Sequence, residues 1–174
     1  HVYSDKGKRS KKAEKEPVKY YSLSGNKNKA KVKVNSAPSY STVFGNTITK
    51  LAETDSKIYC ITAAMEIGTG MSNFVKKYPD RYIDVGIAEG HAVTYSCGIA
   101  TGGYKPIIPF YSTFIQRAYD NIFHDVLLQE LPVIFCMDRA GVVGPDGPTH
   151  HGVYDISLLR NLPNIIITAP KDGN

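Results

Sequence analysis

The sequence contains no uninterrupted apolar run of about 18 residues, the length that a membrane-spanning helix needs. It is also poor in cysteine: Cys60, Cys97 and Cys136 are widely spaced, each has apolar neighbours, and no CxxC pair or metal-type spacing is present. An odd number of thiols that are expected to be buried is typical of a reducing compartment. We therefore expect no membrane partner, and a cytoplasmic protein or, if its source carries plastids, one of the plastid stroma.

Several short motifs that identify enzyme classes are missing as well. The sequence has no GxxxxGK(S/T) phosphate loop, no GxSxG nucleophile turn and no HExxH zinc motif. The GTG at residues 68–70 is too short to make a GxGxxG dinucleotide fingerprint. The sequence therefore gives no indication of a phosphate loop, a serine-nucleophile turn, an HExxH zinc site or a dinucleotide-binding fingerprint.

Positive charge is concentrated at one end of the chain, although the whole 174-residue sequence carries a net charge of only +5. Residues 1–40 hold eleven Lys or Arg and three Asp or Glu, a balance of +8, whereas residues 41–174 hold ten and thirteen, a balance of −3. A basic segment can bind nucleic acid or an anionic membrane, but this one has no aromatic-basic motif for reading bases. We favour a solvated connector and expect no nucleic-acid partner.

We predict a basic interdomain linker at residues 1–38 and a single domain at residues 39–174. The linker is rich in Lys, Ser, Gly and Asn, carries only scattered apolar residues, and is expected to be extended. The remainder is long enough to bury one sizeable core. Because the chain begins with His rather than Met and shows no signal peptide, we expect it to be an internal fragment of a longer protein.

Strand-like and helix-like patterns alternate from residue 39 onward. Apolar and β-branched runs predict strands at residues 57–64, 81–86, 105–110, 132–137 and 164–170. Helices are predicted at residues 43–54, 72–79, 88–100, 113–129 and 156–160, with Ser41 capping the first and Gly102-Gly103 closing the third. The alternation indicates an α/β fold, with a mainly parallel sheet, helices on both faces and right-handed crossovers.

The loops that follow these strands carry glycine and polar residues, as in ITAAMEIGTGM, DVGIAEGHA, YSTFIQR and DRAGVVGPDGPTHHG. They should meet at the carboxyl edge of the sheet and outline a single site. The last loop is the most informative, because its glycines allow a close approach to a ligand. In it, Arg139 offers a fork that suits phosphate, Asp146 a carboxylate, and His150 and His151 two imidazoles. The alternative is a surface loop with incidental polar residues.

Two other loops supply candidate binding residues. Glu89 lies in the first turn of a helix among small apolar neighbours. It either complements the helix dipole or is partly buried and needs a partner, such as a heterocycle with a protonatable nitrogen. Near Tyr111, Phe114 can stack on a flat ring and Arg117 can hold an anion, although ordinary helix packing explains Phe114 equally well.

Together these residues resemble the 1-deoxy-D-xylulose-5-phosphate synthase family, thiamine-diphosphate enzymes of the transketolase superfamily. The resemblance covers essentially the whole chain and is densest over residues 81–155, in YIDVGIAEGHAVTYSCGIATGGYKPIIPFYSTFIQRAYDNIFHDV and LPVIFCMDRAGVVGPDGPTHHGVYD. The opening HVYSDKGK is similar to the segment that joins the family's first and second domains. DGPTHHG alone would admit other transketolase relatives, but DRAG and YSTFIQRAYDNIFHDV narrow the choice.

The resemblance implies a central pyrimidine-binding domain with a thiamine-diphosphate-binding fold. It further implies an enzyme that condenses pyruvate with glyceraldehyde 3-phosphate, releases CO2 and forms 1-deoxy-D-xylulose 5-phosphate for isoprenoid, thiamine and pyridoxal biosynthesis. The expected cofactors are thiamine diphosphate and Mg2+. The expected organisation is a homodimer in which each site combines several domains.

The resemblance also implies roles for individual residues. Glu89 would hydrogen-bond the pyrimidine ring and help form the imino tautomer that deprotonates the thiazolium carbon, and Phe114 would stack on that ring beside Ile87. His150 and His1 are the other catalytic candidates. The substrate-binding candidates are Tyr111, Arg117, Arg139, Asp146 and His150, with Arg139 near the acceptor phosphate.

The sequence departs from the family pattern in two places. Gly90 stands where the family usually has Gln, which removes a possible hydrogen bond and lowers helix stability by about 1 kcal/mol relative to Ala. No GDG-type diphosphate and metal motif is present, so we expect the Mg2+ ligands outside this chain. Two alternatives stay open: another transketolase-like enzyme, and a non-catalytic cofactor-binding domain.

Overall fold

A computed structural model describes residues 3, 8, 10–17, 20, 37–144 and 146–172, and the chain divides into two compact units, His1–Ala37 and Pro38–Asn174. In the first unit, α1 (Lys11–Lys15) begins after Ser10, whose Oγ accepts a hydrogen bond from the Ala13 N–H at 3.4 Å. The expectation of extended chain is therefore wrong for these five residues. Lys, Ala and Glu are good helix formers, and a serine cap favours the helix further.

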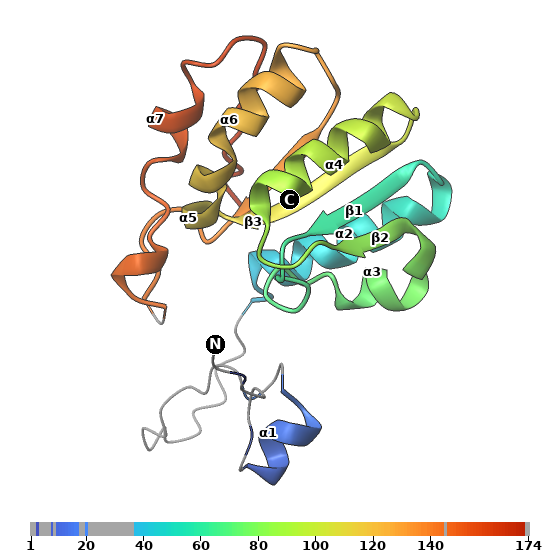
Figure 1. Cartoon of the computed structure of the whole chain (residues 1–174), viewed down its shortest axis with the longest axis vertical. Coiled ribbons are helices and arrows are strands. Elements are labelled where there is room, and N and C mark those ends of the chain that lie inside the picture. The colour runs from blue at the N-terminus through green and yellow to red at the C-terminus, as the bar shows by residue number, and fades with distance from the viewer. Residues whose placement is uncertain are drawn as a thin grey trace. The chain divides into compact units, whose positions relative to one another are not determined.

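The second unit is built on a four-stranded sheet in the order β2-β1-β3-β4 (Figure 1). The strands are β1 (Ile58–Thr62), β2 (Tyr82–Asp84), β3 (Lys105–Tyr111) and β4 (Ile134–Asp138). Every neighbouring pair is parallel. The α/β class and the parallel sheet that the sequence predicts are thus confirmed.

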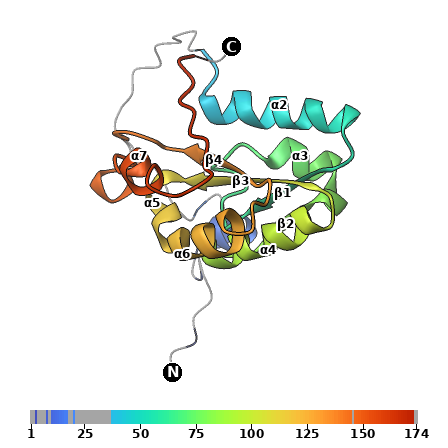
Figure 2. The ribbon, with the colours of Figure 1, turned by 90° about the horizontal axis from the view of Figure 1, so that it is seen from above.

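Helices cover both faces of this sheet (Figure 2). On one side lie α2 (Tyr40–Thr54) and α3 (Ser72–Lys77), and on the other lie α4 (Glu89–Thr101) and α6 (Tyr119–Asn121). The short helix α7 (Asp155–Leu159) follows the glycine-rich loop, as expected. Within the residues that the structure describes, no helix has the length and apolar character to cross a membrane.

The core consists of two apolar clusters, one on each face of the sheet. Because successive strand residues point to opposite faces, Cys60 belongs to the cluster that contains Phe74 of α3, whereas Ile61 belongs to the cluster that contains Val93 of α4. Both central strands are therefore buried on both sides, which leaves the ends of the strands as the places where polar side chains gather.

The single helix expected at residues 113–129 instead changes its pitch along the chain. The segment consists of α5 (Ser112–Ile115), a 3-10 turn (Gln116–Ala118), α6 and a π-helical turn (Ile122–Leu127). Ala118 leaves the helical backbone region, with φ −113° and ψ 12°. Ile115, Ala118, Ile122 and Val126 are all buried, so these changes of pitch keep one apolar face on the core.

Two further expectations are wrong. The N-cap of α2 is Ser39 and not Ser41, since Ser39 Oγ accepts the Thr42 N–H at 3.2 Å. The strand expected at residues 164–170 does not form, and Ile166 is 90% exposed. A strand needs a neighbour that shares its hydrogen bonds, and in the described part of the chain residues 164–170 pair with no strand, so the outer side of β4 remains an edge.

Candidate functional site

The candidate site lies where the four strands end. Parallel pairing brings Thr62, Asp84, Tyr111 and Asp138 to the same edge of the sheet. The loops after these residues are the four that the sequence indicates. In open α/β sheets this edge is the usual place for a ligand.

Asp84 joins the ends of β1 and β2. Its Oδ2 accepts a hydrogen bond from Thr62 Oγ1 at 3.0 Å, and its Oδ1 accepts the N–H groups of Ala64 at 2.9 Å and Gly86 at 2.8 Å. Ala64 has φ +59°, a left-handed conformation that is costly for a residue with a Cβ. The carboxylate therefore fixes two loops at once. Asp84 was not predicted from the sequence, although an aspartate at a strand end, two residues before Gly86, was the available signal.

Glu89 is a buried carboxylate at the first position of α4. It is 4% exposed, and Arg117 Nη1 donates to its Oε1 at 2.6 Å, while the Arg117 side chain itself is 55% exposed. Burial therefore requires a partner, as expected, and Arg117 provides it within the chain. That Arg117 also holds a substrate anion stays a prediction. The structure places this guanidinium on Glu89 and 4.9 Å from the centre of the Phe114 ring.

An aromatic group continues from Arg117 across the site. The rings of Phe114 and Tyr111 are stacked, with centroids 5.9 Å apart and planes 9° apart, and His150 meets Phe114 edge-on at 5.5 Å. Tyr111 is buried against Gly68, where a Cβ would clash with the phenol oxygen. Burial raises the pKa of Tyr111, although nearby Arg139 acts in the opposite direction. The phenol is therefore a hydrogen-bond donor at neutral pH.

Arg139 extends this chain of contacts to the end of β4. Its guanidinium carbon lies 4.6 Å from the centre of the Tyr111 ring, its Nη1 donates to Asp138 Oδ1 at 3.1 Å, and its Nε lies 3.5 Å from Asp146 Oδ2. Nη1 also donates to Ser41 Oγ at 3.1 Å. The residue has φ +60°, which is unusual for a side chain of this size. Asp138 Oδ1 accepts the N–H of Arg139 at 2.8 Å and so supports this conformation.

The glycine-rich loop is held at both ends. Gly141 and Gly152 exchange backbone hydrogen bonds of 2.9 and 2.8 Å. Gly152 also packs so closely on Ser112 that a Cβ there would clash with the hydroxyl. Ser112 Oγ in turn donates to Asp155 Oδ1 at 2.5 Å. The loop that carries Arg139 and His150 is thus closed on itself and tied to the start of α7.

The remaining predicted residues have different positions. Ile87 is 76% exposed in the loop before α4, and His1 lies outside the described residues. His150 Nδ1 lies 2.9 Å from Thr149 Oγ1, and His151 Nδ1 accepts the Val143 N–H at 3.1 Å. The structure therefore brings Glu89, Arg117, Phe114, Tyr111, Arg139, Asp146 and His150 into one connected series of contacts.

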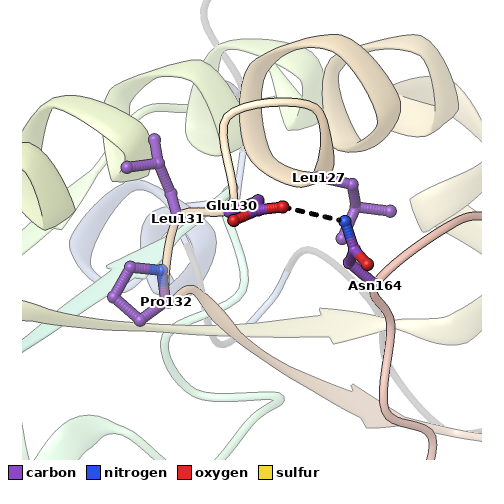
Figure 3. Close-up of a pocket in the computed structure, with 5 residues that line it drawn as sticks. All are labelled: Leu127, Glu130, Leu131, Pro132 and Asn164. Atoms are coloured by element: carbon purple, nitrogen blue, oxygen red, sulfur yellow. Dashed lines mark hydrogen bonds between the residues drawn. The ribbon is translucent and has the colours of Figure 1, made fainter.

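A hollow of about 370 Å³ lies elsewhere, between Leu127, Glu130, Leu131, Pro132 and Asn164 (Figure 3). There Asn164 Nδ2 donates to Glu130 Oε1 at 3.4 Å. Leu131 and Pro132, which line this hollow, come just before β4, so the hollow lies away from the carboxyl edge of the sheet. No predicted ligand-binding residue lines it. Within the described ranges, no group of three His, Cys, Asp or Glu side chains could hold a metal ion.

The sequence matches the family model of the transketolase pyrimidine-binding domain over residues 36–174. Among curated proteins, the 1-deoxy-D-xylulose-5-phosphate synthase of Aquifex aeolicus is 52% identical over 174 residues, which is 99% of this chain and 28% of that protein. The protein of the same name from a Cyanothece species is 57% identical over 176 residues, again 99% and 28%. The chain thus spans about 28% of the length of the curated relatives it matches.

Solved structures show the same fold. A split-gene transketolase, described as an inactive beta4 tetramer, is 28% identical and superposes with a TM-score of 0.61 over 70% of this chain and 40% of that chain. A transketolase from Pichia stipitis in complex with sedoheptulose 7-phosphate is 23% identical, with a TM-score of 0.69 over 81% of this chain and 23% of that chain. At that identity the likeness concerns the fold alone.

Proposed function

The chain belongs to the transketolase pyrimidine-binding domain family, and on that premise we propose that it is this domain of a 1-deoxy-D-xylulose-5-phosphate synthase. The enzyme would condense pyruvate with glyceraldehyde 3-phosphate and release CO2. Its product would be the 1-deoxy-D-xylulose 5-phosphate that isoprenoid, thiamine and pyridoxal biosynthesis use. Relatives of that name at 52 and 57% identity, aligned to almost the entire chain, support this proposal.

The observation that carries the proposal is the buried carboxylate of Glu89, which Arg117 links to the Phe114 ring. A ligand that is flat and has a protonatable nitrogen fits these two groups, which is the chemistry of the pyrimidine of thiamine diphosphate. Arg117 engages Oε1 of Glu89, so we expect Oε2 to hold the proton shared with that nitrogen. Phe114 would stack on the ring, and Ile87 would cover it.

When bound, thiamine diphosphate supplies the electron sink for decarboxylation. Tyr111, Arg139, Asp146 and His150 would surround the substrates, with the fork of Arg139 on the phosphate of the acceptor. The described residues offer no metal-binding cluster. We therefore place the Mg2+ ligands in other parts of the polypeptide and assign no step of this chain to the metal.

The proposal includes the partners and the setting of the domain. Because relatives are more than three times as long as the aligned region, we place the other domains on the same polypeptide, in a homodimer of the cytoplasm or plastid stroma. An assay of the full-length protein tests the function. Pyruvate and glyceraldehyde 3-phosphate should give CO2 and 1-deoxy-D-xylulose 5-phosphate in equal amounts. Turnover of ketose donors instead would indicate another transketolase-like enzyme, and cofactor binding without turnover a non-catalytic domain.

A further inference from the structure

The Ser41 hydroxyl makes two hydrogen bonds that helix capping does not explain. Ser39 caps α2, so the hydroxyl of Ser41 is available for other partners. It donates to Asp138 Oδ2 at 2.7 Å and accepts from Arg139 Nη1 at 3.1 Å. This contact joins the first turn of α2 to the end of β4, nearly a hundred positions later in the chain.

Ser41 and Asp138 form a clamp that determines which edge of the Arg139 guanidinium can face a ligand. Nη1 donates to both of them, each at 3.1 Å. An anion would therefore meet the guanidinium at its other edge, formed by Nε and Nη2. The contact of Nε with Asp146 on that edge is longer, 3.5 Å, and Asp146 is exposed. This is the contact that an incoming anion can most easily replace.

Ser41 is itself fixed by close backbone packing. A Cβ on Gly70 would clash with the carbonyl oxygen of Ser41, and a Cβ on Gly45, one turn further along α2, would clash with Gly70. Two glycines thus let the start of α2 touch the loop after β1. The side chains of Asp138 and Arg139 are only 17 and 30% exposed, so solvent competes little for these hydrogen bonds.

We propose that Ser41 is a positioning residue for phosphate recognition: with Asp138, it holds Arg139 so that the Nε and Nη2 edge faces the phosphate of the acceptor. The proposal rests on the proposed function, which assigns Arg139 to that phosphate. Ser41 acts through Arg139 and does not touch the substrate. Its loss should therefore weaken binding of the phosphorylated acceptor and leave pyruvate unaffected.

The test compares Ser41→Ala with Ser39→Ala in the full-length enzyme. Loss of a neutral hydrogen bond to a charged group should raise KM for glyceraldehyde 3-phosphate about three- to tenfold. The inhibition constant of inorganic phosphate should rise by the same factor, with KM for pyruvate unchanged. Ser39→Ala removes the cap two residues away, so it should lower Tm and leave the acceptor KM as it was. An unchanged acceptor KM in Ser41→Ala, or an equal rise in both KM values, would overturn the proposal.

A double variant separates the positioning role from the assignment of Arg139. If Ser41 acts through Arg139, adding Ser41→Ala to Arg139→Ala should cause no further rise in the acceptor KM. If Arg139→Ala raises that KM and Ser41→Ala does not, only the positioning role is wrong. An acceptor KM unchanged by Arg139→Ala would refute both. Asp138→Asn weakens the other half of the clamp and should raise the same KM, which keeps the test decisive if Ser41→Ala does not fold.

Discussion

Glu89 is buried while its ionic partner Arg117 is more than half exposed, and this asymmetry lets a variant separate the structural role of Glu89 from its proposed catalytic role. In Glu89→Gln the remaining charge is that of Arg117, whose side chain is 55% exposed, so it can turn to solvent without a large desolvation cost. We therefore expect little change in Tm. Because only an acid can share a proton with the pyrimidine nitrogen, exchange of the C2 proton of bound thiamine diphosphate should slow by about 10²- to 10⁴-fold.

The control for this variant is Glu53→Gln, which removes the carboxylate of a different ion pair, that of Glu53 with Lys77. Glu53 contacts Lys77 Nζ at 2.5 Å, and both side chains are about half exposed. It lies in the last turn of α2, at the end opposite Ser41. In Glu53→Gln, C2-proton exchange and turnover should match those of the unmodified enzyme. Near-normal C2 exchange in Glu89→Gln would make Glu89 a helix-terminal acid with no role in proton transfer.

Arg139 is the second residue whose removal should have a specific kinetic effect. Charge-assisted hydrogen bonds contribute about 1.5–3 kcal/mol, so Arg139→Ala should raise KM for glyceraldehyde 3-phosphate roughly tenfold to a hundredfold. Arg139→Lys keeps the charge and loses the fork, and should give an intermediate value. Steady-state kinetics with each substrate varied provide the measurement. A raised KM for pyruvate with an unchanged acceptor KM would reverse the assignment of this arginine.

Helix α4 offers a comparison between two of its glycines. A Cβ on Gly98 would have open space, whereas a Cβ on Gly90 would lie 2.7 Å from Asn121 Oδ1. Gly98→Ala should raise the free energy of unfolding by about 0.5–1 kcal/mol. Gly90→Ala should gain less or lose stability, because Asn121 would have to leave Thr94 and Asp125, to which its Nδ2 donates at 3.1 and 3.2 Å.

Thermal unfolding of both variants in the full-length protein measures this difference. Adding Asn121→Ala to Gly90→Ala should recover the stabilisation that Gly90→Ala alone does not give, since it removes the Asn121 Oδ1 atom that the new Cβ would contact. Equal stabilisation by the two alanines would show that Asn121 moves aside freely. The position where the sequence departs from the family pattern would then carry no packing constraint.

The elements that could be predicted from sequence are those whose pattern is set by burial on the sheet. The four strands and α4 follow from apolar runs and a closing glycine pair, and the site loops follow from the polarity of the strand ends. The cap of α2 could not be predicted, because Ser39 and Ser41 lie two residues apart at the start of the helix, and which of them caps it depends on where the helical backbone begins. The contact of Glu89 with Arg117 was also missed, because it depends on how the segment after β3 changes its pitch.

The thiols of buried Cys60 and half-buried Cys136 link the core of the domain to pH. Burial raises the pKa of Cys136 from an ordinary value of 9.0 to about 11, and burial together with nearby Cys136 raises that of Cys60 further. The folded state thus retains protons that the unfolded chain releases. This contribution to stability is fully present below pH 9.0 and is lost as pH rises through the folded values, at up to about 1.4 kcal/mol per pH unit for each group.

Pulsed alkylation of the full-length protein, followed by mass spectrometry of the Cys136 peptide, measures this directly. The midpoint of Cys136 labelling should lie near pH 11 in the folded protein and shift down on denaturation. Cys60 is fully buried and should react only when the domain unfolds. A folded-state midpoint at the ordinary thiol value would mean that Cys136 is hydrated.

The last prediction concerns the domain as part of a larger molecule. The chain spans about 28% of the length of its curated relatives. We propose that Glu89 and Phe114 contact the pyrimidine, whereas the described residues hold no metal-binding cluster. On this proposal the pyrophosphate is held through Mg2+, for which the described residues offer no ligand cluster. Residues 1–174 expressed alone should therefore show no synthase activity, and at best weak calorimetric binding of thiamine diphosphate with Mg2+. The full-length polypeptide, assayed in parallel, should bind thiamine diphosphate and turn over the two substrates. Turnover by the isolated 174 residues would show that this chain holds the metal and diphosphate by itself, and the division of the site among domains would be wrong.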